Sequence, residues 1–258
     1  MKIPALFILL ATLAAVPALA TSPADALFSK GNTAYVAGEN NAADADAAKA
    51  SYKEAADNYK AAIEAGDVSW AAYFNLGNAS CKLGDIGHAV LDYERAFAID
   101  PVRPEAVLNI AKAREALGLP ATHVKSRIEE WGTRIPMRWW MWGGAVAAWA
   151  LLASLVLPFV HGGHRLATVC AVIASAALCT ACAAGMLAWH LHAKWRIVTT
   201  DDAPMLAAPD DKASQVRKLG QATEAYEMRS YDKWVFVRTE QGDEGWVLAK
   251  DAASVWEK

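Results

Sequence analysis

The sequence predicts a multidomain chain in which an all-α part, a hairpin of two transmembrane helices and a small all-β barrel follow one another. The first observation is the spread of charge: the 258 residues are 21% charged and 55% apolar, yet Arg165 is the only formally charged residue between Trp139 and Ala193. The second is a helical repeat pattern before this stretch, and the third is a series of short β-rich runs after it. Two water-soluble parts therefore flank an apolar middle.

Residues 1–20 have the composition of a secretory signal peptide. Lys2 precedes an apolar run over residues 3–16, and Ala18 and Ala20 provide the small residues of an A-x-A cleavage site. We expect cleavage after Ala20; the alternative is an uncleaved membrane anchor. In both cases the segment that follows is exported.

Residues 139–160 and 166–192 are the two apolar stretches, and each is long enough for a transmembrane helix. At 1.5 Å per residue the first spans roughly 33 Å, against a hydrocarbon core of ~30 Å. Residues 161–165 leave room only for a tight turn, so the helices form a hairpin and both soluble parts lie on one side of the membrane. An aromatic belt is expected at the open ends of the hairpin, from Trp139, Trp140, Trp142, Trp189 and Trp195.

Two signals disagree about the orientation of this hairpin. A cleaved signal peptide places both soluble parts in the periplasm and the turn in the cytoplasm. The positive-inside rule favours the reverse, because the turn carries one arginine, Arg165, whereas the open ends carry Arg134, Arg138, Lys194 and Arg196. We expect the signal peptide to decide, since the N-terminal part is committed to export before the hairpin emerges. The predicted location is the inner (cytoplasmic) membrane, with periplasmic soluble domains.

Residues 21–130 contain the spacing of a tetratricopeptide repeat. The matching residues, counted from Trp70, are Tyr73, Leu76, Gly77, Gly84, Ala89, Tyr93, Ala96 and Pro101. Gly77 and Ala89 leave room for two helices to cross closely, and Tyr93 fills the space between them. The resemblance implies an all-helical array. Ser80 departs from it, at a position where a large aromatic residue is usual.

Two further copies resemble this repeat less closely. Upstream, Gly31 matches Gly77, but about twelve extra residues lie within residues 38–50 and either lengthen the helices or form a polar loop. Downstream, a partial copy begins at Pro104 and is expected to supply the capping helix that stacked repeats need.

The concave face of such an array holds a peptide or a partner's tail, and the resemblance implies that the first helix of each repeat lines it. The residues predicted to line this face are Asn32, Phe74, Asn78, Lys82, Asn109 and Lys112. Paired asparagine amides bind a peptide backbone through donor and acceptor together. The alternative is that Asn32 and Asn78 hydrogen-bond neighbouring helices.

Residues 193–258 have the pattern of a small all-β domain. Short β-rich runs are expected at residues 196–200, 205–208, 222–228, 233–239 and 244–248. Their order, with Trp234 before a buried strand and a Gly-Trp-Val step at Trp246, resembles a bacterial SH3-like barrel. The resemblance implies a shallow groove around Trp234 and Trp246 that binds peptides or cell-wall glycopeptides. The alternative is that these rings build the core, because a domain of ~60 residues needs large buried side chains.

The sequence carries no motif for catalysis, and we expect no enzyme activity, no metal site and no cofactor. Phosphate-binding loops and the G-x-S-x-G and H-E-x-x-H motifs do not occur in it, and His161 and His164 lack an acidic or thiol partner for a metal. Nucleic acid is not expected as a partner, since the net charge is −3 and no basic stripe is present. Cys179 and Cys182 have redox spacing, but small residues in an apolar helix more often serve close packing.

The order of these parts is similar to that of one bacterial family. A signal peptide, repeats containing YFNLGNASCKLGDIGHAVLDYERA, a membrane hairpin and an SH3-like domain together resemble the BatE-like proteins of Bacteroides aerotolerance operons. The resemblance implies a membrane-anchored periplasmic adaptor that works beside von Willebrand A-domain membrane proteins and a MoxR-type ATPase, in aerotolerance or envelope stress. Two other functions stay open at this point: a sensor that binds peptidoglycan through the SH3-like domain, and a thiol-redox membrane protein that uses Cys179 and Cys182.

Overall fold

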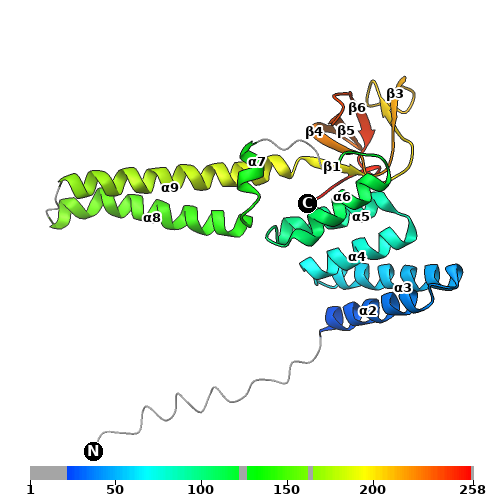
Figure 1. The fold of residues 1–258 in the computed structure, drawn as a ribbon. Coiled ribbons are helices and arrows are strands. Elements are labelled where there is room, and N and C mark those ends of the chain that lie inside the picture. Colours follow the sequence, from blue (N-terminus) through cyan, green and yellow to red (C-terminus); the bar gives the residue numbers. More distant parts are fainter. Residues whose placement is uncertain (1–21, 122–126, 162–164, 257–258) are drawn as a thin grey trace, which may run out of the picture. The chain divides into compact units, whose positions relative to one another are not determined.

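The computed structural model describes residues 22–121, 127–161 and 165–256 (Figure 1). The expected signal peptide lies outside these residues. Within them the structure has eight helices and one seven-stranded antiparallel sheet, so the fold is mixed α/β. The helices are α2 (Pro23–Asn40), α3 (Ala45–Glu64), α4 (Trp70–Leu83), α5 (Ile86–Ile99), α6 (Pro104–Ala116), α7 (Arg127–Gly132), α8 (Met137–His161) and α9 (Arg165–His192). The strands are β1 (Trp195–Val198), β2 (Ala203–Leu206), β3 (Gln215–Leu219), β4 (Glu224–Tyr231), β5 (Trp234–Thr239), β6 (Glu244–Leu248) and β7 (Ala252–Ser254).

The chain divides into two compact units between Val68 and Ser69, and the first is an antiparallel pair of long helices, α2 and α3. Ser22 caps α2 in a capping box, and Asp44 caps α3 by accepting from backbone N–H groups of its first turn. Residues 41–44 alone connect the two helices. The extra residues found in the sequence therefore lengthen both helices and do not form a long polar loop.

One contact recurs between the paired helices of each unit. A tyrosine ring lies against a glycine, and its hydroxyl donates to the side chain of the residue after that glycine. The instances are Tyr59 on Gly31 with Asn32 (2.8 Å), Tyr52 on Gly38 with Glu39 (2.7 Å), and Tyr93 on Gly77 with Asn78 (2.8 Å). A Cβ atom at Gly77 would lie 2.7 Å from the Tyr93 ring. The glycine thus permits an approach that any side chain would block.

The second unit begins with α4, α5 and α6. Ser69 caps α4, whose other end is closed by Gly84 in the left-handed conformation (φ 81°). Asp85 then caps α5 at once by accepting from His88 N. This short connection folds α5 back along α4, and α6 packs on α5 in turn.

The hairpin of α8 and α9 is apolar on its outside. Its stretches Met137–Pro158 and Arg165–His192 are long and apolar enough to cross a membrane, close to the predicted spans. Large apolar side chains are exposed along it, among them Trp142, Trp149 and Leu166. Proteins that face only water rarely expose so much apolar surface, so this hairpin is suited to a lipid environment.

Small residues line the contact between α8 and α9. Cys182 is only 3% exposed and lies against Gly143 and Gly144. The Trp140 ring lies directly on Gly185, which has no side chain to displace it. The two helices approach closely in the manner of membrane helix pairs.

Three indole groups hold α7 and the residues after it against the open end of this hairpin. The bonds run from Trp140 Nε1 to the Gly132 carbonyl (2.8 Å), from Trp189 Nε1 to the Ile135 carbonyl (2.9 Å) and from Trp195 Nε1 to the Glu129 carboxylate (3.0 Å). These three tryptophans, expected in the aromatic belt, thus bond within the protein, whereas Trp139 and Trp142 are exposed.

The strands form one sheet in the order β3-β2-β6-β5-β4-β1-β7, coloured yellow to red in Figure 1. Among the described residues β3 and β7 are its unpaired edges, so the sheet is not closed and the predicted barrel is corrected to an open sheet. All seven strands nevertheless contribute to one core: Val198, Ala203, Met205, Leu219, Ala225, Val235, Val237, Val247 and Ala252. Five strands overlap the predicted runs, whereas β3 and β7 were not predicted.

The helices of the second unit share a hydrophobic core with part of the sheet. Buried residues of α5, α6, α8 and α9 belong to one cluster with Ile197, Ala222 and Val255. Arg95 of α5 donates to the carbonyls of Ser254 and Val255 at 3.4 Å each, and so covers part of the β7 edge. A helix that covers a sheet edge can satisfy the hydrogen-bonding groups of that edge without another strand. This is a physical reason for the sheet to stay open.

Candidate functional site

Five of the six residues predicted for the concave face lie on α4 and α6. Phe74, Asn78 and Lys82 are spaced by four residues on α4, and Asn109 and Lys112 by three on α6, so each set shares one helix face. Asn109 Nδ2 donates to Asn78 Oδ1 at 3.1 Å and joins the two sets. We call this surface the α4–α6 face. Asn32, the sixth residue, lies on α2 in the first unit.

The asparagines of this set act within the fold. Asn78 Oδ1 accepts from Tyr93 as well as from Asn109, and Asn32 Oδ1 accepts from Tyr59. The structure thus shows the alternative role, in which these side chains hydrogen-bond neighbouring helices. Removing Asn78 would leave the hydroxyl of Tyr93 without this acceptor, so Asn78 is a poor probe of binding.

The remaining residues of the α4–α6 face differ in exposure. Phe74 is half-buried, stacked on Trp70 with ring centroids 4.4 Å apart and tilted against Tyr93 at 5.6 Å. Lys82 and Lys112 are exposed. The face therefore combines an ordered amide pair and a partly buried ring with two lysines at the surface.

Trp234 and Trp246 are buried, 3% and 7% exposed, in a cluster with Leu206 on the sheet. The Arg229 guanidinium lies 5.1 Å from the Trp246 ring, and Lys233 Nζ lies 5.5 Å from the Trp234 ring. These rings therefore form a small second core, and an open aromatic groove is not what the structure shows at them.

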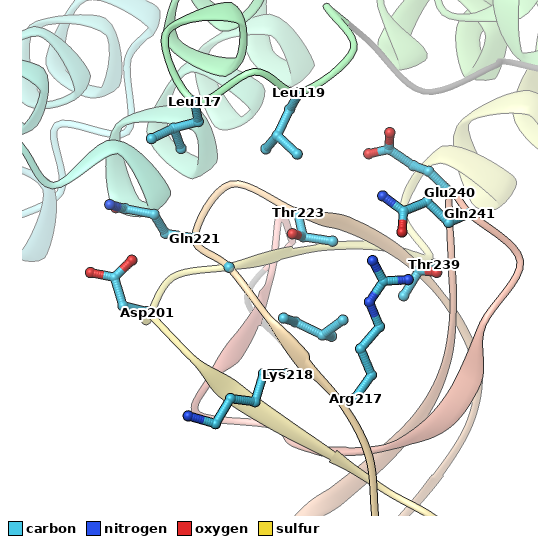
Figure 2. A pocket seen from close by; sticks show the side chains of 12 residues that line it. Leu117, Leu119, Asp201, Arg217, Lys218, Gln221, Thr223, Thr239, Glu240 and Gln241 are labelled. Carbon is cyan, nitrogen blue, oxygen red and sulfur yellow. The ribbon is translucent and has the colours of Figure 1, made fainter.

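A pocket of about 280 Å³ lies where the segment after α6 meets turns of the sheet (Figure 2). Its lining is Leu117, Leu119, Asp201, Arg217, Lys218, Leu219, Gly220, Gln221, Thr223, Thr239, Glu240 and Gln241. Figure 2 shows Leu117 and Leu119 on one side of the pocket and a mostly polar wall opposite them. Gln221 is held in place because its Oε1 accepts from Gly87 N of α5 at 3.0 Å. No residue of this pocket was among the predicted site residues.

Arg114 of α6 anchors the same junction from within. It is fully buried and donates to the carbonyls of Pro120 and Ala222, at 2.7 and 2.6 Å, and to the Glu240 carboxylate at 2.5 Å. Its Nη1 also forms an ion pair with Glu224 at 3.2 Å. Burial raises the pKa of Glu240, and the positive charge of Arg114 opposes that rise.

Asp92 is a buried carboxylate on α5. Burial raises the pKa of Asp92 to about 7, although Arg95, whose Nη1 is 3.4 Å away, favours the ionised form. This carboxyl group therefore changes charge near neutral pH. The same arginine binds the carbonyls beside β7, so the group lies next to the contact between helix and sheet.

The cysteines are all unpaired thiols in the structure. Cys182 is occupied in packing against α8, while Cys179 is partly exposed on the same helix. Within the described ranges, no group of three or more His, Cys, Asp or Glu side chains is arranged to hold a metal ion. No protein-family model matches the chain, and a search of curated proteins found no match.

Proposed function

We propose that the protein is a membrane-anchored adaptor that binds partner proteins through the α4–α6 face and carries out no catalysis. The observation that supports this most strongly is the shared core, in which α5 and α6 pack with Trp140 of α8 and with Cys182 and Trp189 of α9. An adaptor must hold its binding face at a constant position relative to its anchor, and a continuous buried core does so where a flexible linker does not.

The partner we propose is a membrane protein with a von Willebrand A-domain, in a system with a MoxR-type ATPase. This part of the proposal comes from the resemblance to BatE-like proteins of aerotolerance operons. The chemistry of the α4–α6 face suits an acidic segment of such a partner, because Lys82 and Lys112 are exposed on it.

Reversing both lysines should abolish copurification with the partner. The double variant Lys82→Glu/Lys112→Glu places two carboxylates opposite an acidic segment, and we expect binding to weaken at least ~10-fold. The measurement is copurification of the full-length protein with the proposed A-domain partner. A matched control, Lys212→Glu/Lys250→Glu, makes the same charge change at exposed positions of the sheet part and should bind normally.

Both double variants should melt at the temperature of the parent chain, because all four lysines are at the surface. Undiminished copurification by the Lys82/Lys112 variant would contradict the α4–α6 face as the binding surface. The pocket beside α6 would then be the next candidate, and with it the alternative of peptidoglycan binding. The redox alternative has less support, because Cys182 is buried between helices.

We further propose that the soluble parts lie in the periplasm and that the turn between α8 and α9 lies in the cytoplasm. Alkaline phosphatase, which is active only after export, should be active when fused after Ala121 or Lys258 and inactive when fused after Gly163. Activity only at Gly163 would reverse the proposed topology.

A further inference from the structure

An exposed surface that is both cationic and apolar lies at the open end of the hairpin. It consists of Arg127, Ile128, Trp131, Arg134, Ile135 and Arg138, all exposed, and we call it the interfacial face. Its apolar members are large: Ile128 and Trp131 are 45% and 46% exposed. The arginines of this surface have no role in the partner-binding face or in the pocket.

The position of the interfacial face along the hairpin follows from its contacts. Gly132 lies directly on Ala188, four residues before the end of α9, and the Ile135 carbonyl accepts from Trp189. At 1.5 Å per residue, Ala188 is about 6 Å inside the end of the apolar helix. Residues 127–138 therefore lie level with the last turns of the apolar helices, where headgroups and acyl chains of a bilayer meet.

The charges of this segment divide between inside and outside. Glu129 is buried and accepts from Trp195, so it faces the protein. Glu130 is exposed and pairs with Arg134. The outer surface thus carries three arginines and one glutamate, an excess of positive charge beside an exposed tryptophan.

We propose that the interfacial face binds the headgroups of anionic phospholipids. Guanidinium groups form paired hydrogen bonds with phosphate oxygens, and tryptophan and isoleucine insert at the level of the headgroups. The indole bonds from α8 and α9 hold the segment in place beforehand, so little order has to be gained on binding. The inference rests on the membrane embedding of the hairpin that is part of the proposed function.

Quenching of tryptophan fluorescence by brominated lipids tests the membrane embedding of the hairpin and the headgroup preference of the interfacial face separately. The full-length protein is reconstituted in bilayers with brominated phosphatidylglycerol or brominated phosphatidylcholine, and the ratio of their association constants is measured. Each arginine near an anionic surface contributes a factor of about five. We expect the parent chain to prefer phosphatidylglycerol and Arg127→Gln/Arg134→Gln/Arg138→Gln to lose at least ~10-fold of that preference.

The matched control removes the same charge elsewhere. Lys30→Gln/Lys60→Gln/Lys212→Gln changes three exposed lysines in the soluble parts and should keep the preference of the parent chain. Equal affinity for both lipids in the parent chain, or an unchanged preference in the arginine variant, would overturn the proposal, as would loss of preference in the control. Failure of membrane embedding gives a different result: neither lipid would then quench exposed tryptophans of the hairpin such as Trp149.

Discussion

Replacing Arg114 with methionine should unfold the second unit at temperatures where the parent chain is stable. The substitution leaves the buried carboxylate of Glu224 and the partly buried carboxylate of Glu240 without their shared cation, and it removes the donor to the Ala222 carbonyl. Breaking a buried ion pair by removing one partner costs about 3–5 kcal/mol. The measurement is a circular dichroism melt of the full-length protein in detergent.

The pH dependence of this loss has a defined sign. Without Arg114 the raised pKa of Glu240 moves further above its value in the unfolded chain, so the folded state binds more protons than the unfolded state. The free energy of unfolding should therefore fall as pH rises, and the variant should be less stable at pH 8 than at pH 5. Adding Glu224→Gln and Glu240→Gln to the variant should restore part of the loss.

An exposed pair supplies the control for Arg114. Arg238 pairs with Glu244 at the surface of the sheet, and Arg238→Met should cost no more than ~1 kcal/mol. If Arg114→Met melted at the temperature of the parent chain, the contact between α6 and the sheet would be wrong.

Gly87→Val should separate α5 from the sheet. A Cβ atom at Gly87 would lie 2.8 Å from Thr199 Cα and from the Val198 carbonyl oxygen, and these backbone atoms cannot rotate away as a side chain can. Overpacking of this kind costs about 1–3 kcal/mol or more, and a shifted α5 also loses the bond from Gly87 N to Gln221. The full-length variant should show a lower melting temperature and faster proteolysis after α6.

Gly220→Ala is the matched control, because a Cβ atom there meets no atom within 4 Å. It should change stability by no more than about 0.5 kcal/mol, as an exposed substitution without contacts does. Equal melting temperatures for Gly87→Val and Gly220→Ala would contradict the close approach of α5 to β1.

The helix pairs and the apolar hairpin could be predicted because their signals are local. The spacing from Gly77 to Tyr93 lies within one helix pair, and the charge-free spans begin and end within two residues of the observed helices. Hydrophobic periodicity and composition identify such segments directly from the sequence. The length of α2 and α3 stayed open in the sequence, because an Ala/Asp/Asn-rich stretch suits both a helix and a loop.

The joint between helices and sheet could not be predicted, because its partners lie far apart along the chain. Arg114 bonds to Ala222 across 108 residues and Arg95 to Val255 across 160. Nothing in the residues around Arg114 distinguishes it from a surface arginine of an amphipathic helix. Gly87 lies inside the segment that carries the family resemblance. The space for a side chain there is taken by backbone atoms of a strand more than 100 residues later, so the need for glycine could not be predicted locally.

The strands that escaped prediction are the edges of the sheet. β3 reads Gln-Val-Arg-Lys-Leu, with four exposed residues and one buried, and β7 is three small residues. Neither has the alternation or the β-branched content that marks a strand. Trp234 and Trp246, by contrast, were easy to single out in the sequence. Their role was ambiguous, because large aromatic residues serve both cores and binding surfaces.

The core shared by helices and sheet can be completed only at the end of synthesis. Val255 and Trp256, which pack with this core and with Trp189, are synthesised after all its other members. At about 5–20 residues per second, the 160 residues that separate Arg95 from Val255 take roughly 10–30 s to translate. Until then the part of this core that Val255 and Trp256 cover stays exposed, and transiently exposed apolar surface of this kind is prone to aggregation.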